Sequence, residues 1–250
     1  MADRILGIDV GGSSIKSALI DVASGKLVAT PCSVPTPQPA TPPQLLTVFG
    51  DLASHFAPLQ AIGLAMPSVV QHGVTHTAAN IDAGWLGFPI EREFRQRATC
   101  PVKVLNDADA AGLAEMRWGS GRDTHGLVIM LTFGTGIGSA IFIDGRLVPN
   151  TEFGHLEILG HDAELHASAR VRTAEALDWS QWAQRVNLYL EKMHALLWPD
   201  VFILGGAVSE NYALFAPHLR SQAEIRPALF AGHAGIVGAA LAAQLARQSQ

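Results

Sequence analysis

The sequence predicts an α/β protein with two lobes, and three features support this prediction. One pattern occurs twice, over residues 8–21 and 131–144: an apolar strand, a turn rich in glycine and hydroxyl residues, and a second apolar strand closed by Asp. Apolar strands alternate with segments of helical periodicity along the remaining chain. The length of 250 residues, 48% of them hydrophobic, is enough for the cores of two ordinary domains.

Composition excludes several classes of protein. The net charge of −5 argues against a nucleic-acid coat or a membrane-surface protein. No apolar run reaches the roughly 18 residues of a membrane span. Residues 1–4 lead directly into a strand, so we expect no signal peptide. Cys32 and Cys100 are the only cysteines and lack metal-like or redox-like spacing, which favours a reducing cytoplasm.

The first half begins as an antiparallel meander. Strands are expected over residues 4–10, 15–21 and about 26–33. Five prolines between Pro35 and Pro43 forbid a helix and favour a stiff polyproline-II connector. The elements expected next are a helix with Thr41 as N-cap, a strand over 61–66, a hairpin around 71–73, a helix over about 89–98, a strand over 101–105 and an alanine-rich helix after Asn106-Asp107.

The second half opens on a strand over 127–133, which leads into the second glycine turn. A polar stretch around 151–164 is too polar for a core and is expected to be irregular. The other expected elements are a return strand over 139–143, a tight hairpin at Asp144-Gly145, a long helix over 178–198, a strand over 201–204, and helices near 209–217 and 234–247.

Both glycine turns predict phosphate binding, because N–H groups without a neighbouring Cβ can surround phosphate oxygens. A shift of 123 residues aligns Gly11 with Gly134 and Asp21 with Asp144. The glycines at 134, 136 and 138 are not a dinucleotide fingerprint, since a strand and not a helix follows them. The Walker pattern ending in Gly-Lys-Ser/Thr is absent, which argues against a P-loop NTPase.

Asn106 and Asp107 stand where a strand passes into a helix. Polar residues at such a junction often serve only as helix caps. The alternative is a chemical role, since α/β proteins place functional residues at the carboxyl ends of their strands. The residues alone leave both interpretations open.

Six segments taken together are typical of one family: Gly7–Ser13, Thr36–Pro42, Asn106–Ala111, Leu131–Ser139, Pro149–Glu157 and Gly235–Ala240. On these segments the chain closely resembles the ROK sugar kinases of the actin-like ATPase superfamily, and within them the polyphosphate glucokinases. The resemblance implies an actin-like fold of two RNase-H-like lobes, with sugar bound in the cleft. It divides the chain into an N-terminal lobe over 1–107 and a C-terminal lobe over 108–235, with a last helix, about 236–250, packing back on the first lobe.

The resemblance also implies the sugar site. Asp107 matches the family's general base, and Glu152 with His155 matches a Glu-x-Gly-His pair that grips the sugar. The loops around Ser68 and Asn80 line the sugar site of relatives. The residues assigned to the sugar are Ser68, Asn80, Asn106, Asp107, Glu152, His155 and Glu164.

The same resemblance places the phosphoryl donor on both glycine turns and on the Gly-Gly pair that cradles adenosine in ATP-using relatives. The residues assigned to phosphate or nucleotide are Asp9, Gly11, Gly12, Ser13, Ser14, Ile15, Lys16, Thr132, Gly134, Thr135, Gly136, Gly205 and Gly206.

The implied reaction makes chemical sense. A sugar hydroxyl has a pKa far above 7, so a carboxylate near it can accept its proton as the O–P bond forms. The transferred phosphoryl group mainly needs positioning and charge neutralisation, which the turns, Lys16 and a Mg²⁺ can supply. Asp9 is the expected acid near the metal, through water, because Mg²⁺ keeps much of its hydration shell.

Two departures from the family matter. Many ROK proteins hold the His of Glu-x-Gly-His with a three-cysteine zinc site, but the stretch around 160–163 contains no cysteine, so we expect no structural zinc. Polyphosphate-using relatives tend to carry lysines after the Gly-Gly pair, whereas this chain has Val208–Tyr212. The Thr-Pro-x-Pro-Ala-Thr-Pro segment favours polyphosphate, and another basic track is available in Arg92, Arg95, Arg97, Lys103, Arg117 and Arg122.

The expected function is transfer of phosphate from polyphosphate, ATP or both to the 6-hydroxyl of glucose, and the sequence leaves open whether mannose is accepted as well. The alternatives are a strictly ATP-dependent hexokinase, a non-catalytic sugar sensor and an actin- or chaperone-like ATPase. The sensor is disfavoured because ROK repressors begin with a helix-turn-helix. The ATPase is disfavoured because it has no use for the clustered sugar residues. The resemblance also implies a homodimer, which the helix over 178–198 could serve.

Overall fold

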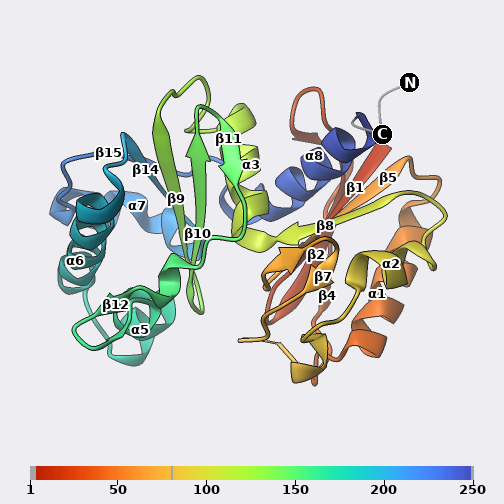
Figure 1. The fold of residues 1–250 in the computed structure, drawn as a ribbon, viewed down its shortest axis with the longest axis horizontal. Helices are drawn as coiled ribbons and strands as arrows, with labels where there is room; N and C mark the ends of the chain where they lie inside the picture. The colour runs from red at the N-terminus through yellow and green to blue at the C-terminus, as the bar shows by residue number, and fades with distance from the viewer. Residues whose placement is uncertain (1–3, 80, 249–250) are drawn as a thin grey trace. The chain divides into compact units, whose positions relative to one another are not determined.

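The computed structural model describes residues 4–79 and 81–248, which form two compact units (Figure 1). Unit 1 comprises the described residues up to Ala114 together with those from His233 onward, and unit 2 is Glu115–Gly232. The division falls inside α3 (Asp107–Trp118). The domain boundary expected at Asp107, the first residue of that helix, stays a prediction. Each unit has its own mixed sheet, so an α/β chain is confirmed.

The sheet of unit 1 has the order β3-β2-β1-β5-β8, and β4 also pairs with β2. β2 runs antiparallel to β1, whereas β5 and β8 continue the sheet in parallel. The single strand predicted over 26–33 is wrong: two short strands replace it, and Pro31 between them has no N–H for a ladder hydrogen bond. The strands are β1 (Arg4–Val10), β2 (Ser14–Asp21), β3 (Lys26–Leu27), β4 (Cys32–Pro35), β5 (Ala61–Met66) and β8 (Val102–Asn106).

Helices cover this sheet. Thr41 is the N-cap of α1 (Pro42–Phe56), as predicted, and its hydroxyl donates to Gln44 Oε1 at 2.9 Å. α8 (Ala234–Gln248) packs against β1, β5 and β8 so closely that a Cβ at Gly63 would overlap the α8 backbone. The remaining elements are the hairpin β6 (Val70–Gln71) and β7 (Val74–Thr75), the 3₁₀ helix η1 (Ala83–Trp85) and α2 (Ile90–Arg95), which is shorter than predicted.

The sheet of unit 2 repeats this topology in the order β11-β10-β9-β14-β15. β10 runs antiparallel to β9, and β14 and β15 continue in parallel. The last strand was not expected from the sequence. The strands are β9 (Leu127–Phe133), β10 (Ile137–Ile143), β11 (Arg146–Val148), β14 (Val201–Gly205) and β15 (Glu224–Pro227).

The long helix α6 (Trp179–Leu197) packs on this sheet. Asp178 caps it, and Trp182, Tyr189 and Met193 are fully buried in the core of unit 2. The region expected near 209–217 is helical, but not as a single helix: three short helical segments span 207–218, and Pro217 lacks the N–H that a continuous helix would need. The other elements are η2 (Phe153–His155), β12 (Glu157–Ile158), β13 (His161–Asp162), α4 (Glu164–Ala167), α5 (Ala169–Ala174), η3 (Ala207–Asn211), α7 (Tyr212–Phe215), η4 (Ala216–His218) and η5 (Ala231–His233).

Candidate functional site

The first glycine turn joins β1 to β2 in unit 1. Val10 pairs with Ile15, and Gly11 N–H closes the turn by donating to Ser14 O at 3.0 Å. The tip is exposed, and within the described residues the N–H groups of Gly12 and Ser13 form no hydrogen bond. Unpaired N–H groups at an exposed glycine tip are suited to an anion.

The proline segment braces this turn and is not a free connector. Thr36 Oγ1 donates to Gly11 O at 2.6 Å, Thr36 N–H donates to Ser13 O at 3.1 Å, and Gln38 Nε2 donates to Gly12 O at 3.3 Å. At its other end, Ala40 O accepts a hydrogen bond from the buried Trp85 indole at 2.7 Å. Three successive carbonyls of the turn are therefore hydrogen-bonded to the proline segment.

Asp9, at the end of β1, is the acid nearest this turn. It lies opposite Lys16 across the β1–β2 pair. Its carboxylate packs against the first turn of α8, where a Cβ at Gly235 would lie 2.6 Å from Asp9 Cγ. Burial raises the pKa of Asp9 to about 6, and the charge of Lys16 opposes this shift. A carboxylate that is costly to ionise in this way is suited to a cation, which would favour its charged form.

Asp107 and Asn106 have different environments at the junction of β8 and α3. Asn106 is buried and caps the helix: its Oδ1 accepts Asp109 N–H at 3.0 Å, and its Nδ2 donates to Ser68 O at 3.3 Å. Asp107 is partly exposed, and its Oδ1 accepts Ala108 N–H at 2.8 Å. The cap interpretation is therefore confirmed for Asn106, whereas the chemical role of the partly exposed Asp107 stays a prediction.

The two loop residues assigned to the sugar are less informative. Ser68 is buried, and its hydroxyl donates to Thr77 O at 2.8 Å, which holds its own loop together. Asn80 lies outside the described residues. The sugar-binding roles of both residues stay predictions.

The second glycine turn, in unit 2, is one residue shorter than the first. Phe133 pairs with Ile137, and Gly134 N–H donates to Gly136 O at 3.0 Å. The 123-residue shift therefore holds for the first strand of each hairpin, whereas the return strands are displaced by one residue. Thr135 is exposed, and its N–H forms no hydrogen bond within the described residues.

Further predicted donor residues lie beside this second turn. Gly205, at the end of β14, pairs with Thr132 on β9. Gly206 adopts a φ of 84° and touches the Phe133 backbone so closely that a Cβ would overlap it. The structure thus brings together the second turn, Thr132 and the Gly-Gly pair.

The segment predicted to bind sugar is anchored directly on the return strand of this turn. Ser139 Oγ donates to Thr151 O at 2.7 Å and accepts Phe153 N–H at 3.0 Å. Tyr189 on α6 donates its hydroxyl proton to Phe153 O at 3.0 Å. Gly154 packs on the Ile137 carbonyl, where a Cβ would overlap it. The glycine of Glu-x-Gly-His therefore permits close contact with the phosphate turn.

Glu164 connects the sugar segment to the turn. Its Oε2 accepts Ile137 N–H at 3.3 Å and covers Gly136, where a Cβ would collide with the carboxylate. Burial raises the pKa of Glu152 and the hydrogen bond to Asp162 raises the pKa of His155, and the charge of Glu164 adds to both shifts. The three predicted sugar residues of unit 2 therefore form one electrostatic cluster.

Burial is the main cause that raises the pKa of Glu152, with Glu164 adding to it and His155 opposing it. The hydrogen bond to Asp162 is the main cause that raises the pKa of His155; burial opposes this rise, and Glu164, Asp162 and Glu152 reinforce it. A protonated His155 among carboxylates and an ionised Glu152 can respectively donate to and accept from sugar hydroxyls.

Sequence reasoning missed the residues that hold this cluster, namely Ser139, Asp162 and Tyr189. Ser139 and Tyr189 act through backbone contacts that no motif records. Asp162 stood in the polar stretch that was expected to be irregular, and only the β12–β13 hairpin places it beside His155.

No group of three or more His, Cys, Asp or Glu side chains within residues 4–79 and 81–248 is arranged to hold a metal ion.

The proposed basic track is largely neutralised by acids. Arg92 lies 2.9 Å from Glu93, Lys103 lies 3.4 Å from Glu91, and Arg122 lies 3.3 Å from Asp123. In contrast, Arg170 N–H donates to Gly134 O at 3.1 Å, so an exposed arginine stands directly beside the second turn.

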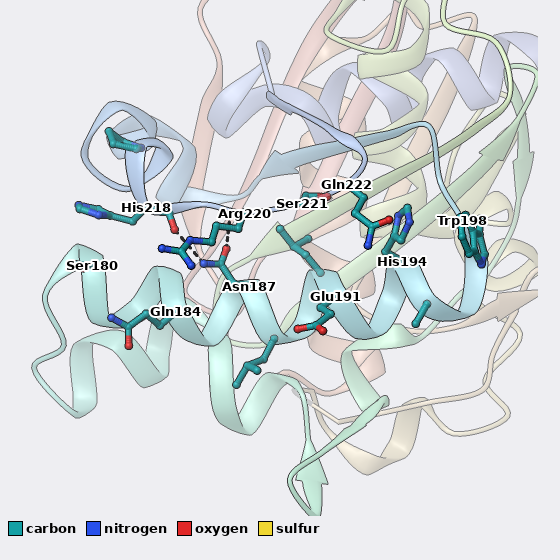
Figure 2. A pocket seen from close by; sticks show the side chains of 14 residues that line it. Ser180, Gln184, Asn187, Glu191, His194, Trp198, His218, Arg220, Ser221 and Gln222 are labelled. Carbon is teal, nitrogen blue, oxygen red and sulfur yellow. Dashed lines mark hydrogen bonds between the residues drawn. The ribbon is translucent and has the colours of Figure 1, made fainter.

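A separate groove of about 910 Å³ follows α6 and residues 217–222 (Figure 2). Asn187 joins its walls by donating to His218 O at 2.9 Å and accepting Arg220 N–H at 2.8 Å. None of the residues predicted to bind sugar or phosphate lines it. Its volume alone does not make it the reaction site, because the groups suited to phosphoryl transfer lie at the glycine turns.

Comparison with known proteins identifies the family. The model of the ROK family matches residues 5–167. The chain is 43% identical to a polyphosphate glucokinase of Mycobacterium tuberculosis over 94% of this chain and 89% of the relative. It is 42% identical to that of Mycobacterium leprae over 96% of this chain and 74% of the relative. A crystal structure of inorganic polyphosphate/ATP-glucomannokinase from Arthrobacter sp. strain KM superposes with a TM-score of 0.93 at 43% identity, covering 98% of this chain and 99% of the other.

The solved relative confirms the predicted ROK sugar kinase fold. Among the helices of the described residues, none combines the length and the apolar character that crossing a bilayer demands. On the match of the family model and on 43% identity along 94% of its length, this chain belongs to the ROK family.

Proposed function

We propose that this chain transfers the terminal phosphoryl group of inorganic polyphosphate or ATP to the 6-hydroxyl of glucose, giving glucose 6-phosphate. One observation carries the proposal: 43% identity with polyphosphate glucokinases along nearly the whole chain. The ordered Glu-x-Gly-His segment on the second glycine turn supports it, since a sugar kinase needs a hydroxyl-binding site close to its phosphates.

Asp107 acts as the general base in this proposal. As O6 of the sugar attacks the terminal phosphorus, the bond from phosphorus to the donor's bridging oxygen breaks, and the O6 proton passes to Asp107. The hydrogen bond from Ala108 N–H to Oδ1 orients the carboxylate. Oδ2 is the oxygen we assign to the proton.

The glycine turns hold the donor phosphates. The unpaired N–H groups of Gly12, Ser13 and Thr135 bind phosphate oxygens, and Lys16 adds a positive charge. Ile15 is buried, so it contributes only its backbone. Ser14 closes the first turn in unit 1, and Thr132, Gly134, Gly136 and the Gly205-Gly206 pair surround the second turn in unit 2.

A Mg²⁺ fits beside Asp9. The pKa of this carboxylate is raised by burial to about 6, and the carboxylate accepts no hydrogen bond from the described residues. Mg²⁺ is commonly held by one or two carboxylates together with substrate phosphates and water. When bound, it would neutralise phosphate charge, and Asp9 and Lys16 would orient the donor around it.

Mannose is a second acceptor in this proposal, since the solved relative is named a glucomannokinase.

We place the enzyme in the cytoplasm, because Cys32 and Cys100 are both free thiols. We also propose a homodimer that uses the groove of Figure 2, where Leu188 of α6 and Trp198, the C-cap residue of that helix, are 44% and 71% exposed. Light scattering should show a dimer in the wild type and a monomer in Trp198→Glu; a wild-type monomer would overturn the homodimer.

The deciding experiment measures glucose 6-phosphate formed from long-chain polyphosphate and from ATP at equal phosphoryl concentration. Product from both donors is expected. Product from ATP alone would establish the strictly ATP-dependent alternative. Glucose binding without product from either donor would favour the sugar sensor and overturn the proposal.

A further inference from the structure

His155 and Asp162 form a close pair that the proposed reaction has not yet used. His155 Nδ1 lies 2.9 Å from Asp162 Oδ2. Their side chains are 48% and 45% exposed, so the pair contributes little to the stability of the fold. Since this pair adds little to stability, a role in orienting the His155 ring is the alternative to consider.

The β12–β13 hairpin brings the two residues together. Glu157 pairs with Asp162 in this hairpin, and Ala163 N–H donates to Leu156 O at 2.9 Å to close its base. Leu159 and Gly160 at its tip have φ values of 53° and 82°, which reverse the chain within two residues. The hairpin thereby returns the chain to the histidine that precedes it.

The carboxylate determines which ring nitrogen faces outward. An ionised carboxylate only accepts hydrogen bonds, so Nδ1 must carry a proton where it meets Asp162. Nε2 is then the nitrogen left for a ligand. The imidazolium has an N–H at both positions, so a protonated His155 presents Nε2 as a donor.

We propose that Asp162 is a positioning residue for sugar binding: it fixes the His155 ring and makes Nε2 a hydrogen-bond donor to a sugar hydroxyl. This inference rests on the proposed function, in which His155 binds the sugar. Asp162 itself does not touch the sugar.

The charges around His155 give the expected pH dependence. The titratable groups facing it are Asp162 on β13, Glu164 on α4 and Glu152 before η2, and the pKa of His155 is raised mainly by the hydrogen bond to Asp162. A raised histidine pKa means that the donor form persists to higher pH and is lost as pH rises through that pKa. Without the Asp162 charge, the donor form would disappear at lower pH.

The test is Asp162→Asn, with Glu157→Gln as the matched control in the same hairpin. At neutral pH, Asp162→Asn should raise the KM for glucose roughly tenfold, as expected for loss of a charge-assisted hydrogen bond, while kcat changes less. The ratio of variant to wild-type KM should shrink toward acidic pH, where His155 is protonated in both proteins. Glu157→Gln should keep the wild-type KM profile.

Several outcomes would overturn the inference. One is a KM profile for Asp162→Asn that matches that of Glu157→Gln; another is an increase in KM that is equal at every pH and accompanied by lower thermal stability. If the variant does not fold, nitrogen NMR of the wild type decides: the proton must reside on Nδ1, and the pKa of His155 must lie above its ordinary value.

Activity measurements separate this inference from the proposed function. If the wild type makes product, and His155→Asn raises the KM for glucose but Asp162→Asn does not, this inference alone is refuted. An inactive wild type refutes the proposed function and this inference with it.

Discussion

Neighbouring residues at the β8–α3 junction have different environments, and the proposed reaction uses Asp107. Asn106 uses both ends of its amide within the protein, whereas Asp107 is partly exposed at the first residue of α3. Asp107→Asn keeps the shape of the side chain but removes the base. We expect glucose binding to persist and turnover to fall by roughly 10²–10⁴-fold.

Two measurements check this expectation together. Glucose 6-phosphate production gives the loss of turnover, and the shift in melting temperature on adding glucose reports retained binding. Full activity in the variant would remove the general-base assignment. Loss of the glucose-induced shift would instead make Asp107 primarily a sugar ligand.

Glu152 should act mainly on sugar affinity. Burial and the charge of Glu164 raise the pKa of Glu152. The ionised form of Glu152, which accepts hydrogen bonds, is therefore lost at a higher pH than for an ordinary glutamate as the pH falls. Glu152→Gln should raise the KM for glucose roughly tenfold or more at neutral pH, with a smaller change in kcat. The difference from wild type should narrow at acidic pH, where Glu152 is itself protonated. Unchanged glucose affinity would show that the Glu-x-Gly-His assignment is wrong.

Single residues also show the limit of sequence reasoning. Glu152 and His155 could be singled out because they match the Glu-x-Gly-His motif, and Glu164 because the family resemblance assigns it; their binding roles stay predictions. Asp162 could not, because its contact depends on a two-residue hairpin turn at Leu159-Gly160 that has no strong sequence signal.

At the scale of elements, long and strongly periodic segments were predictable and the proline segment was not. The strands at 4–10 and 127–133 and the helix at 178–198 have regular apolar patterns, and each lies within about a residue of its expected bounds. The prolines correctly exclude a helix, but composition cannot indicate that Thr36 and Gln38 bond to turn carbonyls 25 and 26 residues away. Those contacts join segments that are far apart in the sequence, so they form only when the chain has folded.

The bracing of the first turn leads to a prediction. Thr36→Val keeps the shape of the side chain and removes the hydrogen bond to Gly11 O. We expect the KM for the phosphoryl donor to rise several-fold, because a looser turn holds its N–H groups less well, and the free energy of unfolding to fall by about 1 kcal/mol. The KM for glucose should not change.

Thr41→Val is the matched control, since Thr41 belongs to the same segment but caps α1. It should cost about 0.5–2 kcal/mol of stability without changing the donor KM. Equal effects of the two variants on the donor KM would mean that the segment influences the turn only through general stability.

At the scale of the whole molecule, the number of charged residues says less about polyphosphate binding than the ion pairs that these residues form. The net charge of −5 and the scarcity of lysines suggested a poor fit to a polyanion, and the arginines of residues 92–122 were offered as a track. The structure pairs Arg92 with Glu93 and Arg122 with Asp123, each its neighbour in sequence, and pairs Lys103 on β8 with Glu91 on α2. Sequence could count these charges, but it could not indicate that Arg170 would lie at the second glycine turn.

Arg170 should therefore affect polyphosphate use more than the arginines of α2 do. Its N–H is bonded to Gly134 O, its side chain is exposed, and it forms no ion pair with the described residues. A long polyanion extends beyond the turn and gains more than ATP from a neighbouring cation. We expect Arg170→Gln to raise the KM for long-chain polyphosphate roughly 3- to 10-fold at low salt, with a smaller change for ATP. The increase in the KM for polyphosphate should shrink as salt screens the charge.

Arg92→Gln, which removes a cation already paired with Glu93, is the control. If the two variants have the same polyphosphate KM at every salt concentration, Arg170 is not a donor contact.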